Sequence, residues 1–226
     1  MEILVVAAHP DDEVLGLGGT LCKLSSEGHC IHLLVVTDGS SKQYEGREDL
    51  ERILDEKAKQ TILCSKILGI KTIDYGGFPD MMLDTISHTQ INECISSIIE
   101  KYHIEVVFTH FYGDLNKDHK CVFESTLVSV RPLANQSVKH VLLYKTPSST
   151  EWNISNTNNV FLPNVFVDIT RFEEQKLKAL QQYGKELRPF PHPRSLEAIK
   201  QYDSACGISV GCEFAEQFML IRSLTR

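Results

Sequence analysis

The sequence lacks the long apolar run that a membrane-spanning helix requires. Its longest apolar stretch near the N-terminus runs from Ile3 to Ala8, whereas about 20 consecutive apolar residues are needed to span a bilayer. The start of the chain also has no basic leader followed by a small-residue cleavage site. We therefore expect neither a signal peptide nor a membrane anchor, and we expect a cytoplasmic protein.

The 226 residues also lack an excess of positive charge. Lys and Arg total 23 against 30 Asp and Glu, which gives a formal net charge of −7. Binding to nucleic acid or to an anionic membrane depends mainly on Lys and Arg, so this balance argues against both partners. We expect a small-molecule partner instead, and we ask whether some of the carboxylates cluster with histidine, as metal ligands do.

Cysteine occurs, but without the spacing of a disulfide framework or of a Cys-type zinc site. The seven cysteines are Cys22, Cys30, Cys64, Cys94, Cys121, Cys206 and Cys212. Their number is odd, and no two form a C-x-x-C pair. This usage favours free thiols in a reducing compartment.

Short apolar runs alternate with longer segments of helical periodicity, which predicts β-α-β units and a mostly parallel sheet. We expect strands at 2–8, 31–36, 71–75, 105–109, 140–144 and 165–168, helices at about 12–27, 47–68, 87–102, 120–130, 171–183 and 195–202, a loop at 76–83 and a surface excursion at 148–159. The predicted fold is a Rossmann-like three-layer α/β/α sandwich with strand order 3-2-1-4-5 plus C-terminal additions. Because no repeat or linker interrupts the pattern, residues 1–226 are expected to form a single domain.

Two polar clusters follow predicted strands of this sheet. The first is His9-Pro10-Asp11-Asp12-Glu13, after the first strand, and the second is Asp114-Leu115-Asn116-Lys117-Asp118-His119, after the fourth. In open α/β sheets ligands bind beyond the carboxyl ends of the strands, where the strand order reverses. With the order 3-2-1-4-5 the first and fourth strands are neighbours, so both clusters should face one crevice.

Each cluster alone could simply begin a helix, because proline and carboxylates both suit a first helical turn. The two adjacent carboxylates of Asp11 and Asp12, however, repel each other unless a cation compensates them. His9, Asp12 and His119 would form a two-His, one-Asp set that leaves a coordination position open, as in catalytic zinc sites. Asp11 is then predicted as the general base. Asp118 could orient an imidazole by accepting its second N–H, although the sequence does not say which ring.

Six segments carry a resemblance to a known family. They are Ala8-His9-Pro10-Asp11-Asp12-Glu13, Thr37-Asp38-Gly39, Gly77-Phe78-Pro79-Asp80, Asp114-Leu115-Asn116-Lys117-Asp118-His119, Pro191-His192-Pro193-Arg194-Ser195 and Glu213-Phe214-Ala215-Glu216-Gln217-Phe218. In this order, and over nearly the whole chain, they resemble the PIG-L (LmbE-like) family of zinc-dependent N-acetylglucosaminyl deacetylases. The resemblance implies Zn²⁺, or another divalent metal, on His9, Asp12 and His119, with Asp11 as base. It implies hydrolysis of a linear amide, usually the N-acetyl group of an N-acetylglucosamine unit.

Further candidates come from the same segments. Asn116 stands where some family members have histidine, and because an amide cannot deliver a proton, that task is assigned to Asp11 or to His192. His192, held between two prolines, is also predicted to stabilise the oxyanion. The candidate substrate-binding residues are Asp38, His110, Asp114 and Arg194. For Asp38 a turn with Gly39 is the alternative, and for His110 a polar cap at a strand end.

The sequence also departs from the family pattern. Many relatives carry R-x-x-E where this chain has Lys57 and Gln60, and Arg-Gly where it has Cys206-Gly207. Both changes remove side chains that can bind an anion or a hydroxyl group through two hydrogen bonds. They affect the expected substrate, an N-acetylated sugar, more than the metal centre. Family members often self-associate, so a homo-oligomer is a further expectation.

The rival hypothesis is a nucleotide- or dinucleotide-binding module without hydrolytic activity. Gly16-Leu17-Gly18-Gly19 follows the first strand, and Asp38 lies about 20 residues further on, where a ribose-binding acid is expected. The fingerprint is incomplete, because Leu21 occupies the position of its third glycine. Acidic residues at the strand-to-helix turn would also repel a pyrophosphate. The sequence therefore favours the metal-dependent hydrolase.

Overall fold

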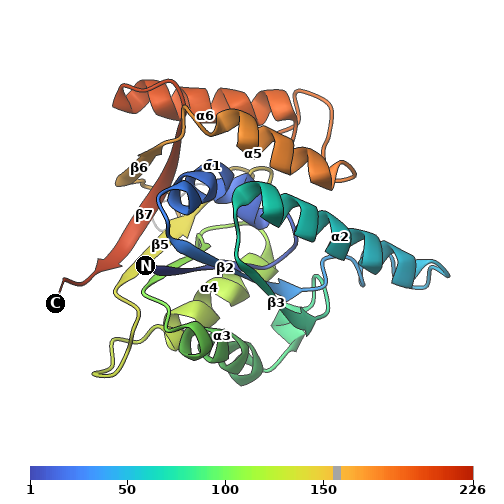
Figure 1. The fold of residues 1–226 in the computed structure, drawn as a ribbon. Helices are drawn as coiled ribbons and strands as arrows, with labels where there is room; N and C mark the ends of the chain where they lie inside the picture. Colours follow the sequence, from blue (N-terminus) through green and yellow to red (C-terminus); the bar gives the residue numbers. More distant parts are fainter. Residues whose placement is uncertain (155–158, 226) are drawn as a thin grey trace.

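The computed structural model describes residues 1–154 and 159–225, and it has three layers (Figure 1). A seven-stranded sheet lies in the middle, with strand order β3-β2-β1-β4-β5-β7-β6. The strands are β1 (Glu2–Ala7), β2 (Cys30–Thr37), β3 (Thr72–Phe78), β4 (Val106–His110), β5 (His140–Tyr144), β6 (Val165–Asp168) and β7 (Ala215–Ser223). Strands β1 to β5 are parallel, whereas β7 runs antiparallel to both β5 and β6. The predicted three-layer fold and the order 3-2-1-4-5 are confirmed.

Helices cover both faces of this sheet. They are α1 (Asp12–Ser26), α2 (Leu50–Leu68), α3 (His88–Tyr102), α4 (Lys117–Ser129), α5 (Glu173–Leu180) and α6 (Leu196–Val210), with short 3₁₀ helices η1 at Leu83–Thr85 and η2 at Gln181–Tyr183. Helices α3 and α4 lie on one face, and α1, α2, α5 and α6 on the other (Figure 1). Of the described helices, none is long and apolar enough to cross a bilayer.

The first strand shows why the sheet is buried on both faces. Ile3, Val5 and Ala7 belong to the core beneath α1 and α2. Leu4 and Val6 belong to the core beneath α3 and α4. Because successive side chains of a strand point to opposite faces, a continuous apolar run fills two cores at once. The run fixes where β1 ends, and therefore where the polar cluster begins.

Some predicted elements were wrong. Strand β7 was not predicted, and the helix expected at 195–202 continues to Val210. The predicted loop at 76–83 begins too early, because β3 includes Gly76 and Gly77. A Cβ on Gly76 would lie 2.5 Å from the carbonyl oxygen of Val36, so the absence of a side chain lets β3 approach β2 there. Of the predicted excursion at 148–159, residues 155–158 lie outside the described part of the chain.

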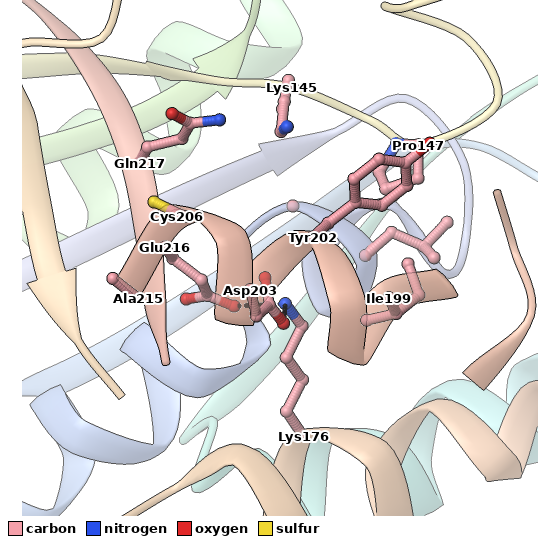
Figure 2. Close-up of a pocket in the computed structure, with 12 residues that line it drawn as sticks. Lys145, Pro147, Lys176, Ile199, Tyr202, Asp203, Cys206, Ala215, Glu216 and Gln217 are labelled. Carbon is pink, nitrogen blue, oxygen red and sulfur yellow. Dashed lines mark hydrogen bonds and ion pairs between the residues drawn. The ribbon is translucent and has the colours of Figure 1, made fainter. Parts of the chain in front are cut away.

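A buried ion cluster joins the C-terminal elements to α1. Figure 2 shows the Lys176 side chain extending from α5 toward Asp203 of α6 and Glu216 of β7. Glu216 also accepts the backbone N–H groups of Gly19 and Thr20, at 3.0 and 2.7 Å, just after α1 is interrupted at Leu17. The adjoining cavity measures about 20 Å³, room for about one water molecule. The cluster therefore links α5, α6 and β7 to α1, and the cavity beside it is too small to hold a substrate.

Glu173 of α5 is a buried acid whose two carboxylate oxygens lack a hydrogen-bond partner among the described residues. Burial, together with the nearby Asp203 carboxylate, raises the pKa of Glu173 from 4.5 to about 8. A group with a raised folded-state pKa holds its proton longer in the folded protein, so stability falls as pH rises from about 4.5 to 8. We predict that Glu173→Gln removes part of this loss. Relative to the wild type, its Tm should be about 2–4 °C higher at pH 9 than at pH 5.

Glu174→Gln is the matched control, because Glu174 is the adjacent residue and its side chain is 90% exposed. Thermal unfolding of the three proteins at both pH values measures the effect. Parallel pH dependence of Glu173→Gln and wild type would contradict the prediction.

Candidate active site

The two polar clusters lie side by side because β1 and β4 are parallel neighbours. Ile3 pairs with Val106, and Val5 pairs with Phe108. The chain after each strand therefore leaves the sheet at the same edge, and His9 comes two residues after the end of β1. Strand β1 connects to β2 on one side and has β4 on the other, so the strand order reverses here. This is the position at which open α/β sheets bind ligands.

His9, Asp12 and His119 form the centre of the site. Nδ1 of His9 lies 3.3 Å from Nε2 of His119 and 3.3 Å from Oδ2 of Asp12. Oδ1 of Asp12 lies 3.4 Å from Nε2 of His119. Potential ligand atoms of the three residues all fall within 4.8 Å of one another. The structure thus brings together the three residues that the sequence predicts as metal ligands.

These residues fit a divalent cation. Oδ1 of Asp12 is buried and accepts no hydrogen bond from the part of the chain that the structure describes, which is costly for a carboxylate oxygen without a cation or donor. The facing nitrogens of His9 and His119 are too close for both to carry a hydrogen toward each other. One cation between the three groups would use this oxygen and both nitrogens. Two nitrogens and one carboxylate are a donor set that suits zinc and other borderline divalent ions.

Carboxylates also contact the other nitrogen of each imidazole. Nε2 of His9 lies 3.1 Å from Oδ2 of Asp118 and 3.3 Å from Oδ1 of Asp80. Nδ1 of His119 lies 3.2 Å from Oδ1 of Asp114. Such contacts fix the orientation of a metal-binding imidazole. Asp118 therefore faces His9 and not its own neighbour in the sequence, which the sequence had left open.

Asp114 does not have the predicted substrate-binding position. It is 1% exposed, and its carboxylate accepts hydrogen bonds from the hydroxyl groups of Ser149 and Thr150 in addition to facing His119. These contacts leave it no route to the cavity. Ser149 and Thr150 fall in the segment predicted as a surface excursion, and the structure instead places them behind the site.

The charges of these groups shift one another's pKa values. Burial opposes the charge on His119, but Asp12 and Asp114 outweigh it and raise the pKa of His119 to about 9. Burial likewise opposes the charge on Asp12, but His119 and His110 outweigh it and hold the pKa of Asp12 well below its usual range. The negative charge of the carboxylates therefore favours positively charged groups between them.

Asp11 lies beside this centre in an unusual backbone conformation. Its φ is 113°, in the region that residues with a side chain rarely adopt. Its Oδ2 lies 3.1 Å from Nη1 of Arg194, and its backbone N–H donates to Oε2 of Glu13 at 3.0 Å. Burial raises the pKa of Asp11 to about 6, Arg194 opposes this shift, and Asp12 adds to it. Asp11 thus has a pKa close to neutrality, as a general base requires.

A polar cavity of about 350 Å³ opens next to these residues. Its lining residues are His9, Pro10, Asp11, Gly39, Gln43, Lys57, Asp80, Met81, Asn116, Glu186, Arg188 and Arg194. The predicted candidates Asn116 and Arg194 are among them. Oδ1 of Asn116 also accepts the N–H of Asp118 and so caps α4. The volume lies in the range of small-molecule sites.

His110 was predicted to bind substrate, but it lies beneath the site. It is fully buried, and its Nε2 accepts the backbone N–H of Ala8 at 2.9 Å. Its ring stacks on His119 with centroids 3.9 Å apart, and Nε2 also lies 3.0 Å from the Tyr144 hydroxyl. Burial and the charge of His119 lower the pKa of His110 to about 4. A neutral ring packed in this way supports His119 from below and does not reach a substrate.

Asp38 and His192 do not line the cavity either. Oδ1 of Asp38 accepts the N–H groups of Ser40 and Ser41, so Asp38 forms the turn that was its alternative reading. Nδ1 of His192 accepts the N–H of Arg194, and its ring packs edge-on against Trp152. His192 therefore shapes the loop that carries Arg194, and the structure gives it no contact with the centre.

A model of the PIG-L family, described as GlcNAc-PI de-N-acetylase, matches residues 4–129. This span is more than half of the chain, and it contains both polar clusters. The chain belongs to the PIG-L family. The resemblance inferred from the sequence motifs is confirmed.

Named relatives of this PIG-L chain include deacetylases. It is 29% identical over 190 residues to the uncharacterized deacetylase YaiS of Escherichia coli (strain K12), across 80% of this chain and 89% of that protein. It is 26% identical over 190 residues to diacetylchitobiose deacetylase of Thermococcus kodakarensis, across 82% of this chain and 70% of that protein.

One protein of known structure with the same fold is described as a hydratase, whereas the relatives above are described as deacetylases. The crystal structure of GalB, the 4-carboxy-2-hydroxymuconate hydratase from Pseudomonas putida KT2440, superposes with a TM-score of 0.78 at 16% identity. The superposition covers 100% of this chain and 98% of that one. The fold therefore does not fix the reaction, which has to be argued from the site.

Several residues of the PIG-L site had no assigned role before the structure. Lys57, read in the sequence as the loss of an anion-binding group, is buried, lines the cavity and pairs with Glu186. The Lys57 ammonium group thus supplies a positive charge at the position where many relatives carry arginine. Asp80 and Glu13 lie within the segments that resemble the PIG-L family, and this position was the indication in the sequence that they belong to the site. No local pattern marks Glu186, because its contact with Lys57 of α2 joins residues 129 positions apart in the sequence.

Proposed function

We propose that this PIG-L family protein is a metal-dependent amidohydrolase that removes an N-acyl group, usually acetyl, from an amino-sugar compound. The observation that carries the proposal is the grouping of His9, Asp12 and His119 at the edge of a polar cavity that His9 and Asp11 line. The deacetylase relatives support the same reaction class. The products would be a free amine and a carboxylate.

His9, Asp12 and His119 would hold the metal, with zinc as the expected ion. When bound, such an ion polarises an amide carbonyl and lowers the pKa of a coordinated water. Asp118 and Asp80 orient the His9 ring, and Asp114 orients His119. These carboxylates keep the ligand nitrogens directed at one point, so the chain supplies a preformed site.

Asp11 is the proposed general base. Its carboxylate lines the cavity, and its neighbour in sequence, Asp12, is a proposed ligand. Asp11 accepts a proton from the attacking water and returns it to the departing nitrogen. The Arg194 guanidinium, 3.1 Å away, favours the ionised form of Asp11 before the reaction. Because His192 lies outside the cavity and Asn116 cannot deliver a proton, Asp11 carries out both transfers.

The cavity suits a polar substrate. Charged or amide side chains form most of its wall, and they include Gln43, Lys57, Glu186 and Arg188. Sugar hydroxyl groups can exchange hydrogen bonds with donors and acceptors of this kind. The acidic balance of the chain remains an argument against nucleic acid as the substrate, and zinc and a cytoplasmic location remain expectations of this proposal.

The dinucleotide-binding alternative is disfavoured by the glycines of α1. A Cβ on Gly16 would lie 2.3 Å from the Tyr144 ring, and a Cβ on Gly19 would lie 2.7 Å from Ile169. Both glycines allow α1 to pack closely against neighbouring elements. They therefore have a packing role in the helix, whereas the fingerprint glycines form a phosphate-binding turn.

The metal assignment predicts one tightly bound divalent ion per chain. Elemental analysis of the purified protein should find close to one equivalent, and a chelator should remove it together with activity. Zinc added back should raise the Tm, because an ion that binds only the folded state stabilises it. Asp12→Ala should abolish both effects. Wild-type protein that neither binds a divalent ion nor responds to chelation would contradict the assignment.

The role of Asp11 predicts a variant that separates metal binding from catalysis. Asp11→Asn keeps the shape of the side chain but removes the base, so kcat should fall at least about 100-fold. The metal content should stay near one equivalent, because the three ligands are unchanged. Full activity in this variant would exclude Asp11 as the base.

The reaction itself is tested with a panel of N-acetylated compounds and detection of newly released primary amine. N-acetylglucosamine, N,N'-diacetylchitobiose and an N-acetylglucosaminyl glycoside present the same amide on different carriers. We expect amine release from at least one of them by metal-loaded protein and none by Asp11→Asn. Tight binding of NAD without hydrolysis of any amide would instead favour the dinucleotide-binding alternative.

A further inference from the structure

The backbone of Asp11 needs a specific contact to hold it. Its φ of 113° is energetically costly for any residue with a side chain. Its carbonyl oxygen is satisfied within α1, because it accepts the N–H groups of Val14 and Leu15 at 3.2 and 3.0 Å. Its N–H stands ahead of the first turn of α1, where a helix offers no backbone acceptor, so it needs an acceptor from elsewhere.

Glu13 supplies that acceptor from the first turn of α1. Its Oε2 accepts the Asp11 N–H at 3.0 Å, and its Oε1 accepts the hydroxyl of Tyr183 at 2.8 Å. The Glu13 side chain is fully buried, and Tyr183 is also buried. Both carboxylate oxygens are thus engaged: Oε2 accepts from the residue being held, and Oε1 accepts from Tyr183 and, at 3.5 Å, from the Cys64 thiol of α2.

The backbone and the carboxylate of Asp11 are consequently each held by a contact. Glu13 binds its backbone, and Arg194 binds its carboxylate at 3.1 Å. Tyr183 and Arg194 belong to one stretch of chain, residues 183–194, so this stretch determines both contacts. A shift of Asp11 by about 1 Å would displace the proposed base from the water it deprotonates, and displacements of this size can reduce rates about 100-fold.

We propose that Glu13 is a positioning residue, which holds Asp11 in its left-handed backbone conformation through the Asp11 N–H and so aims the Asp11 carboxylate into the cavity. The kinetic part of this inference rests on the proposed role of Asp11 as base. Glu13 itself does not line the cavity, so it acts through Asp11 and not on the substrate.

Three variants separate a hydrogen-bonding role from a merely structural one. In Glu13→Gln the amide oxygen can still accept the Asp11 N–H, and the amide nitrogen can donate to the Tyr183 oxygen. Glu13→Met removes the acceptor at similar length. The double variant Glu13→Met/Tyr183→Phe also removes the hydroxyl that Glu13→Met leaves unpaired, which protects the fold if the single variant fails. Glu173→Gln is the control, because it alters a buried glutamate outside the site.

We expect metal-loaded Glu13→Gln and Glu173→Gln to keep kcat within about threefold of wild type. The double variant should lose kcat at least about 30-fold, with KM within about threefold and metal content unchanged. Such a split identifies displacement of the base, since loss of substrate binding would raise KM. A folded, metal-loaded double variant with wild-type kcat would overturn the proposal, as would a loss in Glu13→Gln equal to that in the double variant.

A second readout does not depend on activity. Hydrogen exchange of the Asp11 amide, followed by NMR, should be slow in wild type and in Glu13→Gln and at least about tenfold faster in the double variant. Equal exchange in all of them would overturn the proposal even if kcat falls. If wild type hydrolyses none of the amides, the proposed function fails, and the exchange experiment still decides whether Glu13 holds Asp11.

Discussion

Parallel pairing of β1 with β4 is the constraint on which the site depends. The two strands are connected through β2, β3 and three helices, yet they end at the same edge of the sheet. Their pairing places His9 and Asp12 opposite His119, which is more than a hundred residues away in sequence. Both strands are buried on both faces, so this register resists slipping. The charged centre therefore follows directly from two buried, neighbouring strands of the sheet.

The centre has a compact arrangement of charge. Two imidazoles lie among the carboxylates of Asp12, Asp80, Asp114 and Asp118, and His110 packs beneath them as a neutral ring. Negative groups at this density would repel one another without positive charge between them. Burial is the main cause that raises the pKa of Asp11 toward neutrality, Arg194 opposes this shift, and the Asp12 carboxylate adds to it. Asp12 thus contributes both to the negative charge of the centre and to the raised pKa of its neighbour.

The sequence predicted the central architecture well, because apolar runs and polar clusters are local patterns. Strand order and the grouping of His9, Asp12 and His119 followed from them. Strand β7 was missed because it is only partly buried and shows no regular alternation. Contacts formed by tertiary folding were also beyond local patterns. The partner of Asp118 and the buried positions of Asp114 and His110 could therefore not be predicted, since each depends on which side chain lies opposite.

The wall of the cavity is built from two separate parts of the chain. One side comes from residues between His9 and Asn116, whereas Glu186, Arg188 and Arg194 come from one C-terminal stretch. That stretch lies outside the span matched by the family model, residues 4–129. Substitutions there would alter the wall without changing His9, Asp12 or His119, but they would also act on the Arg194 contact with Asp11. The same stretch therefore couples the shape of the cavity to the position of the Asp11 carboxylate, so a change in one alters the other.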